Sequence, residues 1–181
     1  MFTQVRAAVL SAKAPIRLVL AICLLGFACA NAQPTFAVQG AFDDTGTFTA
    51  MFNFEAAGNI YSAITAVSTD GTTRTGASYS FVCGSPDIPN CGDGFSPFAG
   101  SVAFQTTNAA NQTGLPTLFM SFTVPLDQVF FGETFSLVIG DHNSDEGTCG
   151  NATCTVDPNT RFTTSGTAAT QSIPLFEYLV F

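Results

Sequence analysis

Asp44, Thr45 and Gly46 form the tripeptide that carries the catalytic carboxylate of aspartic proteases. That chemistry uses two carboxylates sharing one proton, so a chain with one copy would have to dimerise to act. The surroundings are typical of a turn instead, because Asp43 adds a second charge and Phe48 begins an alternating strand. Aspartate side chains bond to their own backbone and glycine adopts positive φ, so we interpret residues 43–46 as a turn without a catalytic residue.

A second candidate site follows Gly140, where oxygen-bearing side chains alternate at Asp141, Asn143 and Asp145. Side chains at such spacing can curl round one hard cation, which is how Ca²⁺ loops are built. The stretch is not an EF-hand, because its glycine is seventh instead of sixth and its twelfth residue is not glutamate. The sequence therefore leaves two interpretations open, a Ca²⁺ site and a hydrated loop. No other cofactor is expected.

Four cysteines follow the N-terminal segment, namely Cys83, Cys91, Cys149 and Cys154. In an exported chain, four cysteines indicate two disulfides with three alternative pairings. Their spacing favours the local bridges Cys83–Cys91 and Cys149–Cys154. By loop entropy each local bridge would add roughly 2–3 kcal/mol and each crossed bridge roughly 4 kcal/mol, so energy alone does not choose between them. A zinc site that includes His142 is the competing interpretation.

The first 32 residues have the organisation of a secretory signal peptide. Basic residues precede the apolar stretch 18–30, and a small-x-small cleavage site lies before Gln33. The apolar stretch is shorter than the ~20 residues that span a bilayer, so no membrane span is expected in the mature chain. We therefore predict a signal peptide at residues 1–32 and one domain at residues 33–181, secreted to the periplasm or the extracellular space.

The mature chain is strongly acidic. Its basic residues are Arg74 and Arg161, against all thirteen acidic residues, which gives a net charge of −11. Such a surface repels phosphate backbones and anionic lipid head groups, so we expect no nucleic-acid partner. The remaining classes of partner are a protein, a glycan or a matrix component, and divalent cations are the natural charged partner.

Apolar and polar residues alternate in most of the segments that must position the candidate site residues. Phe48, Ala50, Phe52 and Phe54 fall on one face of a strand, and a turn at residues 57–59 leads into the next strand, 60–67. Further strands are predicted at residues 78–82, 101–105, 117–124, 135–139 and 161–169. Phenylalanine carries no polar atom and suits a dry core between sheets. About seven or eight short strands predict an all-β, two-sheet antiparallel β-sandwich, with a small β-barrel as the alternative.

The order of these motifs resembles a group of small exported bacterial β-sandwich proteins, many of which carry a PEP-CTERM sorting tail. The resemblance rests on GAFDDTGTF at residues 40–48, FEAAGNI at residues 54–60, the Asp-Gly turn at residues 70–71 and RFTTSGT at residues 161–167. The sequence has no Pro-Glu-Pro tripeptide. The resemblance implies export and a β-sandwich, and it implies no shared activity.

These observations predict a non-catalytic, secreted or cell-surface protein with a structural or binding role. One alternative is a small outer-membrane β-barrel, because apolar residues alternate in the segment 173–181. Another is a dimeric, retropepsin-like aspartic protease that uses Asp44.

Overall fold

The structure is a computed structural model that describes residues 33–83, 98–140, 143–152, 154 and 160–171. The predicted signal peptide, Cys91, Asp141, His142 and the segment 173–181 lie outside the described residues. The 3₁₀ helix η1 (Leu126–Gln128) is short, and the described residues contain no helix that is long and apolar enough to cross a membrane.

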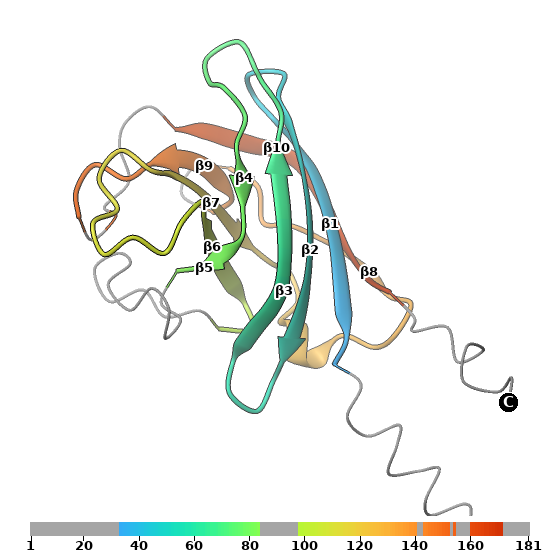
Figure 1. Ribbon diagram of the computed structural model, residues 1–181. Helices are drawn as coiled ribbons and strands as arrows, with labels where there is room; N and C mark the ends of the chain where they lie inside the picture. Colours follow the sequence, from blue (N-terminus) through green and yellow to red (C-terminus); the bar gives the residue numbers. More distant parts are fainter. Residues whose placement is uncertain (1–32, 84–97, 141–142, 153, 155–159, 172–181) are drawn as a thin grey trace, which may run out of the picture. The chain divides into compact units, whose positions relative to one another are not determined.

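The described part of the chain is all-β and forms an antiparallel sheet of ten strands (Figure 1). The strands are β1 (Thr35–Phe42), β2 (Thr47–Glu55), β3 (Ile60–Ser68), β4 (Ser78–Tyr79), β5 (Phe81–Val82), β6 (Ser101–Gln105), β7 (Pro116–Ser121), β8 (Thr134–Ser136), β9 (Asp145–Thr148) and β10 (Arg161–Gln171). Their order in the sheet is β4-β3-β2-β1-β10-β9-β7-β6-β5, and β8 pairs with β10 beside this path. The prediction of an all-β, antiparallel fold is confirmed.

The sheet is nearly closed, because two stretches of chain connect its large part (β4-β3-β2-β1-β10) to its small part (β9-β7-β6-β5). Within β10, Arg161 and Phe162 pair with β9, while the rest of the strand pairs with β1. On the other side, Ser80 alone separates β4, which pairs with β3, from β5, which pairs with β6. The Ser80 amide donates to the Gln105 carbonyl at 3.1 Å, which continues the ladder across the change of partner.

The core lies between the two parts of the sheet and is rich in phenylalanine. The predicted inward face of β2 is confirmed, since Phe48, Ala50, Phe52 and Phe54 are all buried. The Phe52 ring lies 5.6 Å from that of Phe36 on β1 and 5.6 Å from that of Phe104 on β6, measured between ring centroids. The largest aromatic side chains therefore join the two parts of the sheet.

Several boundaries differ from the predicted ones. β1 was not predicted, although Phe36, Val38 and Phe42 are buried on its inner side. β9 replaces the second half of the predicted loop after Gly140. β7 ends at Ser121 rather than at residue 124, and the Thr123 amide donates to the Ser136 carbonyl instead of continuing the strand. β8 ends at Ser136, whereas the predicted strand extends to residue 139.

Candidate functional site

Asp44 lies in the turn that connects β1 to β2, as the sequence predicts. The Phe42 amide closes the turn on the Gly46 carbonyl at 2.8 Å. The predicted positive φ at Gly46 is wrong, because Thr45 adopts it instead, with φ 73°. Gly46 is required for another reason: a Cβ there would collide with Nη1 of Arg161. The turn is therefore shaped by a side chain from β10.

Arg161 is the centre of a buried network of charges. Its side chain is fully buried and pairs with two carboxylates, Glu146 Oε2 at 2.7 Å from Nη2 and Asp44 Oδ1 at 3.2 Å from Nη1. Nη2 also donates to the Thr69 carbonyl at 2.9 Å, and the guanidinium lies 4.2 Å from the centroid of the Phe42 ring. The planar guanidinium can satisfy all these partners at once, which a lysine ammonium cannot.

Asp44 is held in its charged form. Burial alone would raise the pKa of Asp44, but hydrogen bonds from the Thr73 side chain and the Gly46 amide, together with the charge of Arg161, outweigh it and lower the pKa below its usual value. The Thr73 hydroxyl donates to Oδ2 at 2.8 Å and the Gly46 amide donates to Oδ1 at 3.1 Å. The carboxylate is thus engaged on both oxygens.

Glu146 is the cross-strand neighbour of Arg161, since β9 pairs with β10 at these two residues. The phenol of Tyr79 on β4 is buried on the same side, and burial, followed by the charge of Glu146, raises its pKa. The network therefore joins the β1–β2 turn, the segment after β3, and strands β4, β9 and β10. It lies where the large and small parts of the sheet meet, and its geometry fits a structural role.

A polar cleft of about 610 Å³ adjoins this network. Its lining residues are Asp43, Asp44, Thr72, Thr73, Arg74, Thr148 and Thr160. The charged groups in it already have partners in the fold, because Asp43 Oδ1 accepts from the Phe162 amide at 3.0 Å and Arg74 Nη2 donates to the Gly147 carbonyl at 3.1 Å. The cleft is therefore the solvent side of the network and offers a ligand little unused charge.

Asp44→Asn is expected to lower the free energy of unfolding by about 1–3 kcal/mol at neutral pH, because it removes a charge that accepts several hydrogen bonds. Since the folded-state pKa of Asp44 is lowered, its stabilisation is present above the unfolded value of 3.8 and is lost as the pH falls through the folded value. Urea denaturation at neutral pH and near pH 3 should therefore show the difference between wild type and variant shrinking in acid. Asp43→Asn, in the exposed neighbour, serves as the control and should change little. A difference that does not depend on pH would contradict this account.

The structure describes two of the three residues of the predicted Ca²⁺ loop, Asn143 and Asp145. Asp145 is buried in β9, where it pairs with Phe119 of β7 and Phe162 of β10. The Asn143 amide donates to the Gly140 carbonyl at 3.2 Å in the turn before β9. Among the described residues, no three acidic, histidine or cysteine side chains gather as a metal site would need. Asp141 lies outside them, so the Ca²⁺ site stays a prediction.

Of the predicted disulfides, the local pair Cys149–Cys154 is present. It is buried beside Thr117 and Gln105, whose Oγ1 and Nε2 lie 3.1 Å and 3.4 Å from the Cys154 sulfur. Cys83 belongs to the same buried cluster. Its predicted partner Cys91 is outside the described residues, and the Cys83–Cys91 pairing stays a prediction.

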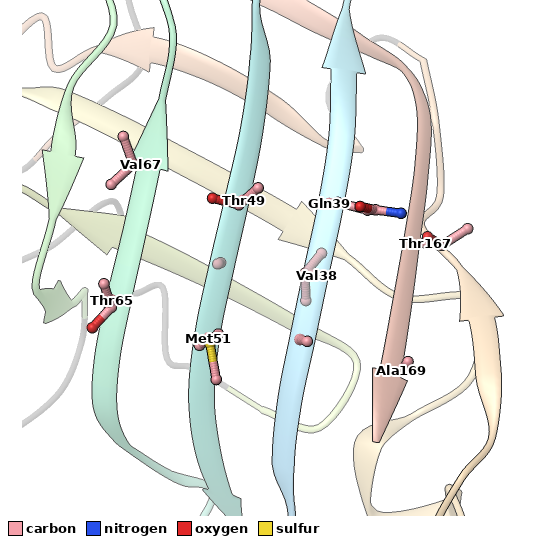
Figure 2. A pocket seen from close by; sticks show the side chains of 10 residues that line it. Val38, Gln39, Thr49, Met51, Thr65, Val67, Thr167 and Ala169 are labelled. Atoms are coloured by element: carbon pink, nitrogen blue, oxygen red, sulfur yellow. The ribbon is translucent and has the colours of Figure 1, made fainter. Parts of the chain in front are cut away.

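A surface that the sequence did not indicate lies on the outer side of β3, β2, β1 and β10. Figure 2 shows these four strands side by side, with Gln39 extending along the sheet toward Thr167. Two adjoining hollows of about 430 Å³ and 470 Å³ lie on this surface. We call it the outer face and define it by the outward-facing residues that line the hollows: Ala37, Gln39, Ala41, Thr47, Thr49, Met51, Thr65, Val67, Ser165, Thr167 and Ala169.

Strand register arranges the outer face in three rows, of which the shortest is Thr47, Ala41 and Ser165. The central row is Val67, Thr49, Gln39 and Thr167, which are successive cross-strand neighbours. The methionine row is Thr65, Met51, Ala37 and Ala169, in the same strand order. Met51 and Val67 are exposed by 48% and 42%, and they line the first hollow together with the smaller side chains of Ala37 and Ala169.

No residue of the outer face is charged, although the chain carries thirteen acidic side chains. Charged and polar residues normally cover the solvent side of an antiparallel sheet. A broad uncharged surface with exposed methionine and valine is typical of a contact surface rather than of a face that only meets water. The outer face is therefore the strongest candidate for a functional surface among the described residues.

Comparison of the chain with protein-family models, with curated proteins and with solved structures finds no match.

Proposed function

We propose that this chain is an exported, non-catalytic β-protein with a structural or binding role, and that the outer face is the surface through which it acts. The observation that carries the proposal is the absence of charge on the outer face of a chain whose residues 33–181 have a net charge of −11. In this proposal the large and small parts of the sheet are the two layers of a sandwich. Export is supported by the signal-like residues 1–32 and by the Cys149–Cys154 bridge, which forms in oxidising compartments.

A non-catalytic role is supported by the state of Asp44. An aspartic protease needs a carboxyl group that keeps a proton shared with a second carboxylate, which raises one pKa of the pair. Here the pKa of Asp44 is lowered, and its carboxylate forms a salt bridge with Arg161. Asp44 is thus arranged to hold the fold together, and the protease alternative is not adopted.

The chemistry of the outer face favours a macromolecular partner whose own contact surface is uncharged. Threonine hydroxyls and the Gln39 amide can form hydrogen bonds with a partner, while the exposed side chains of Met51 and Val67 provide apolar contact area. A lipid-facing surface would instead carry a continuous apolar band. The outer face therefore suits contact with a protein or a glycan better than contact with lipid.

Retention on cells tests the proposal. Labelled mature chain, exported so that its disulfides form, is added to washed cells of the producing organism that carry the gene, and the bound fraction is measured after sedimentation. Met51→Glu is expected to lower retention about tenfold or more, because a contact would bury an unpaired charge. Ile139→Glu is the matched control, since Ile139 is 52% exposed and lines neither hollow. Equal retention of wild type and Met51→Glu would contradict the outer face as the contact surface.

A further inference from the structure

The hydrogen-bonding groups of the outer face are complementary to themselves. Hydroxyl and carboxamide groups each carry both a donor and an acceptor, so two identical copies of the central row can bond to each other. A face of carboxylates could not do so, because its groups only accept and repel one another. Thr49, Gln39 and Thr167 are adjacent in one row and line both hollows. This chemistry fits a second copy of the same surface.

The shape of the outer face is also complementary to itself. A two-fold interface places the same patch on both sides, so each patch must contain both the projecting and the receiving element. Met51 is the projecting element, and the hollow beside Ala37 and Ala169 in the methionine row is the receiving one. Met51 lies on β2, and Ala37 and Ala169 lie on the next two strands, β1 and β10. One interface can therefore include the projecting side chain and the hollow.

Electrostatics select this face among the surfaces that two copies can present. Each mature chain carries a net charge of −11, so copies repel wherever acidic residues meet. The residues that line the hollows of the outer face carry no charge, so two copies can meet there without this repulsion. Strands lie about 4.8 Å apart with about 3.3 Å per residue, and the face spans five residues on each of β1, β2 and β10 and three on β3, so its footprint is roughly 300 Å² per copy. Such a footprint belongs to weak interfaces, so a concentration-dependent dimer is expected.

We propose that the partner of the outer face is a second copy of this chain, packed sheet against sheet about a two-fold axis. The inference rests on the proposed function, because it names the occupant of the same surface. Two such faces pack about 10 Å apart with their strands roughly aligned. Met51 of each copy enters the hollow of the other copy, and the two central rows exchange hydrogen bonds.

Sedimentation velocity of the mature chain tests the proposal, over micromolar to submillimolar concentrations and at low and high salt. Wild type is expected to shift from monomer to dimer with concentration, and salt should favour the dimer because it screens the repulsion between two acidic chains. Met51→Glu should weaken dimerisation at least tenfold, whereas Ile139→Glu should dimerise as wild type does. Wild type that stays monomeric throughout, or Met51→Glu that dimerises equally, overturns the proposal. A face covered by residues 172–181 of the same chain or by another molecule would give the first of these results.

A charge-pairing experiment separates face-to-face contact from a contact elsewhere. Met51→Glu and Met51→Lys should each be monomeric alone, while their equimolar mixture should form a mixed dimer, because opposite charges then meet across the interface. No mixed dimer, with dimerisation by wild type intact, overturns the face-to-face arrangement. Cell retention distinguishes the two proposals. If wild type is monomeric but Met51→Glu still lowers retention, only the dimer is refuted. If wild type dimerises but Met51→Glu is retained as well as wild type, only the proposed function is refuted.

Discussion

Arg161→Met is expected to lower the free energy of unfolding by about 3–5 kcal/mol, because it leaves two buried carboxylates without their shared counter-ion. The Arg161 and Glu146 side chains are fully buried, and that of Asp44 is 3% exposed. The aliphatic part of arginine is replaced by methionine at little cost in packing, so the loss reports the charge. Urea denaturation of the mature chain at neutral pH measures it.

Two further variants show that the loss comes from unpaired charge. Adding Asp44→Asn and Glu146→Gln to Arg161→Met removes every charge of the network and should recover much of the stability. Arg74→Met is the matched control, because Arg74 is half-buried and donates to a carbonyl, and its loss should be clearly smaller. The effect of Arg161→Met alone should shrink in acid, where the carboxylates take up protons. A triple variant as unstable as Arg161→Met would contradict this explanation.

The strands that could be predicted are those whose own residues carry a recognisable hydrophobic pattern. β2 alternates buried apolar residues with exposed or half-buried residues along its whole length, and it lies where the sequence predicts it. β6 has the predicted bounds, Ser101–Gln105, although all five of its residues are buried. In both cases the side chains of one short segment suffice to identify the strand, because every second residue of a strand points to the same side.

β9 could not be predicted because its strand state depends on a distant residue. Asp145, Glu146 and Gly147 have low β propensity and are typical of a loop. Their pairing becomes favourable once Arg161 on β10 neutralises Glu146 across the ladder. The same arginine reaches Asp44, 117 residues earlier in the chain. A weak signal was present, since a buried acid needs a cation and the mature chain offers only two arginines.

The outer face could not be predicted from the sequence, because it also depends on residues that are far apart in the chain. The uncharged outward residues Thr47, Thr49 and Met51 can be read from β2, but one strand does not make a surface. The surface forms because β1 pairs on one side with β2 and on the other with β10, more than a hundred residues away. Sequence periodicity fixes which side of a strand faces out, and only the order of strands in the sheet decides which outward sides lie together.

Phe52→Ala is expected to lower the free energy of unfolding by about 3–5 kcal/mol, through lost apolar burial and the cavity left behind. The Phe52 side chain is fully buried, and its ring contacts those of Phe36, Tyr61 and Phe104 at centroid distances of 5.6, 5.3 and 5.6 Å. These neighbours come from β1, β3 and β6, so the substitution weakens the contact between the large and small parts of the sheet. The change in urea midpoint, multiplied by the slope of unfolding free energy against urea, gives the loss.

Two controls show whether that loss comes from the core. Phe52→Leu keeps most of the volume and should cost clearly less than alanine, because a smaller cavity remains. Phe131→Ala removes the same ring from a residue that is 61% exposed, and its effect should stay within about 0.5 kcal/mol. If Phe52→Ala and Phe131→Ala had similar small effects, the interior between the two parts of the sheet would not be the stabilising core. The stability of the chain would then depend chiefly on the Arg161 network and the disulfides, and Arg161→Met would be expected to unfold it outright.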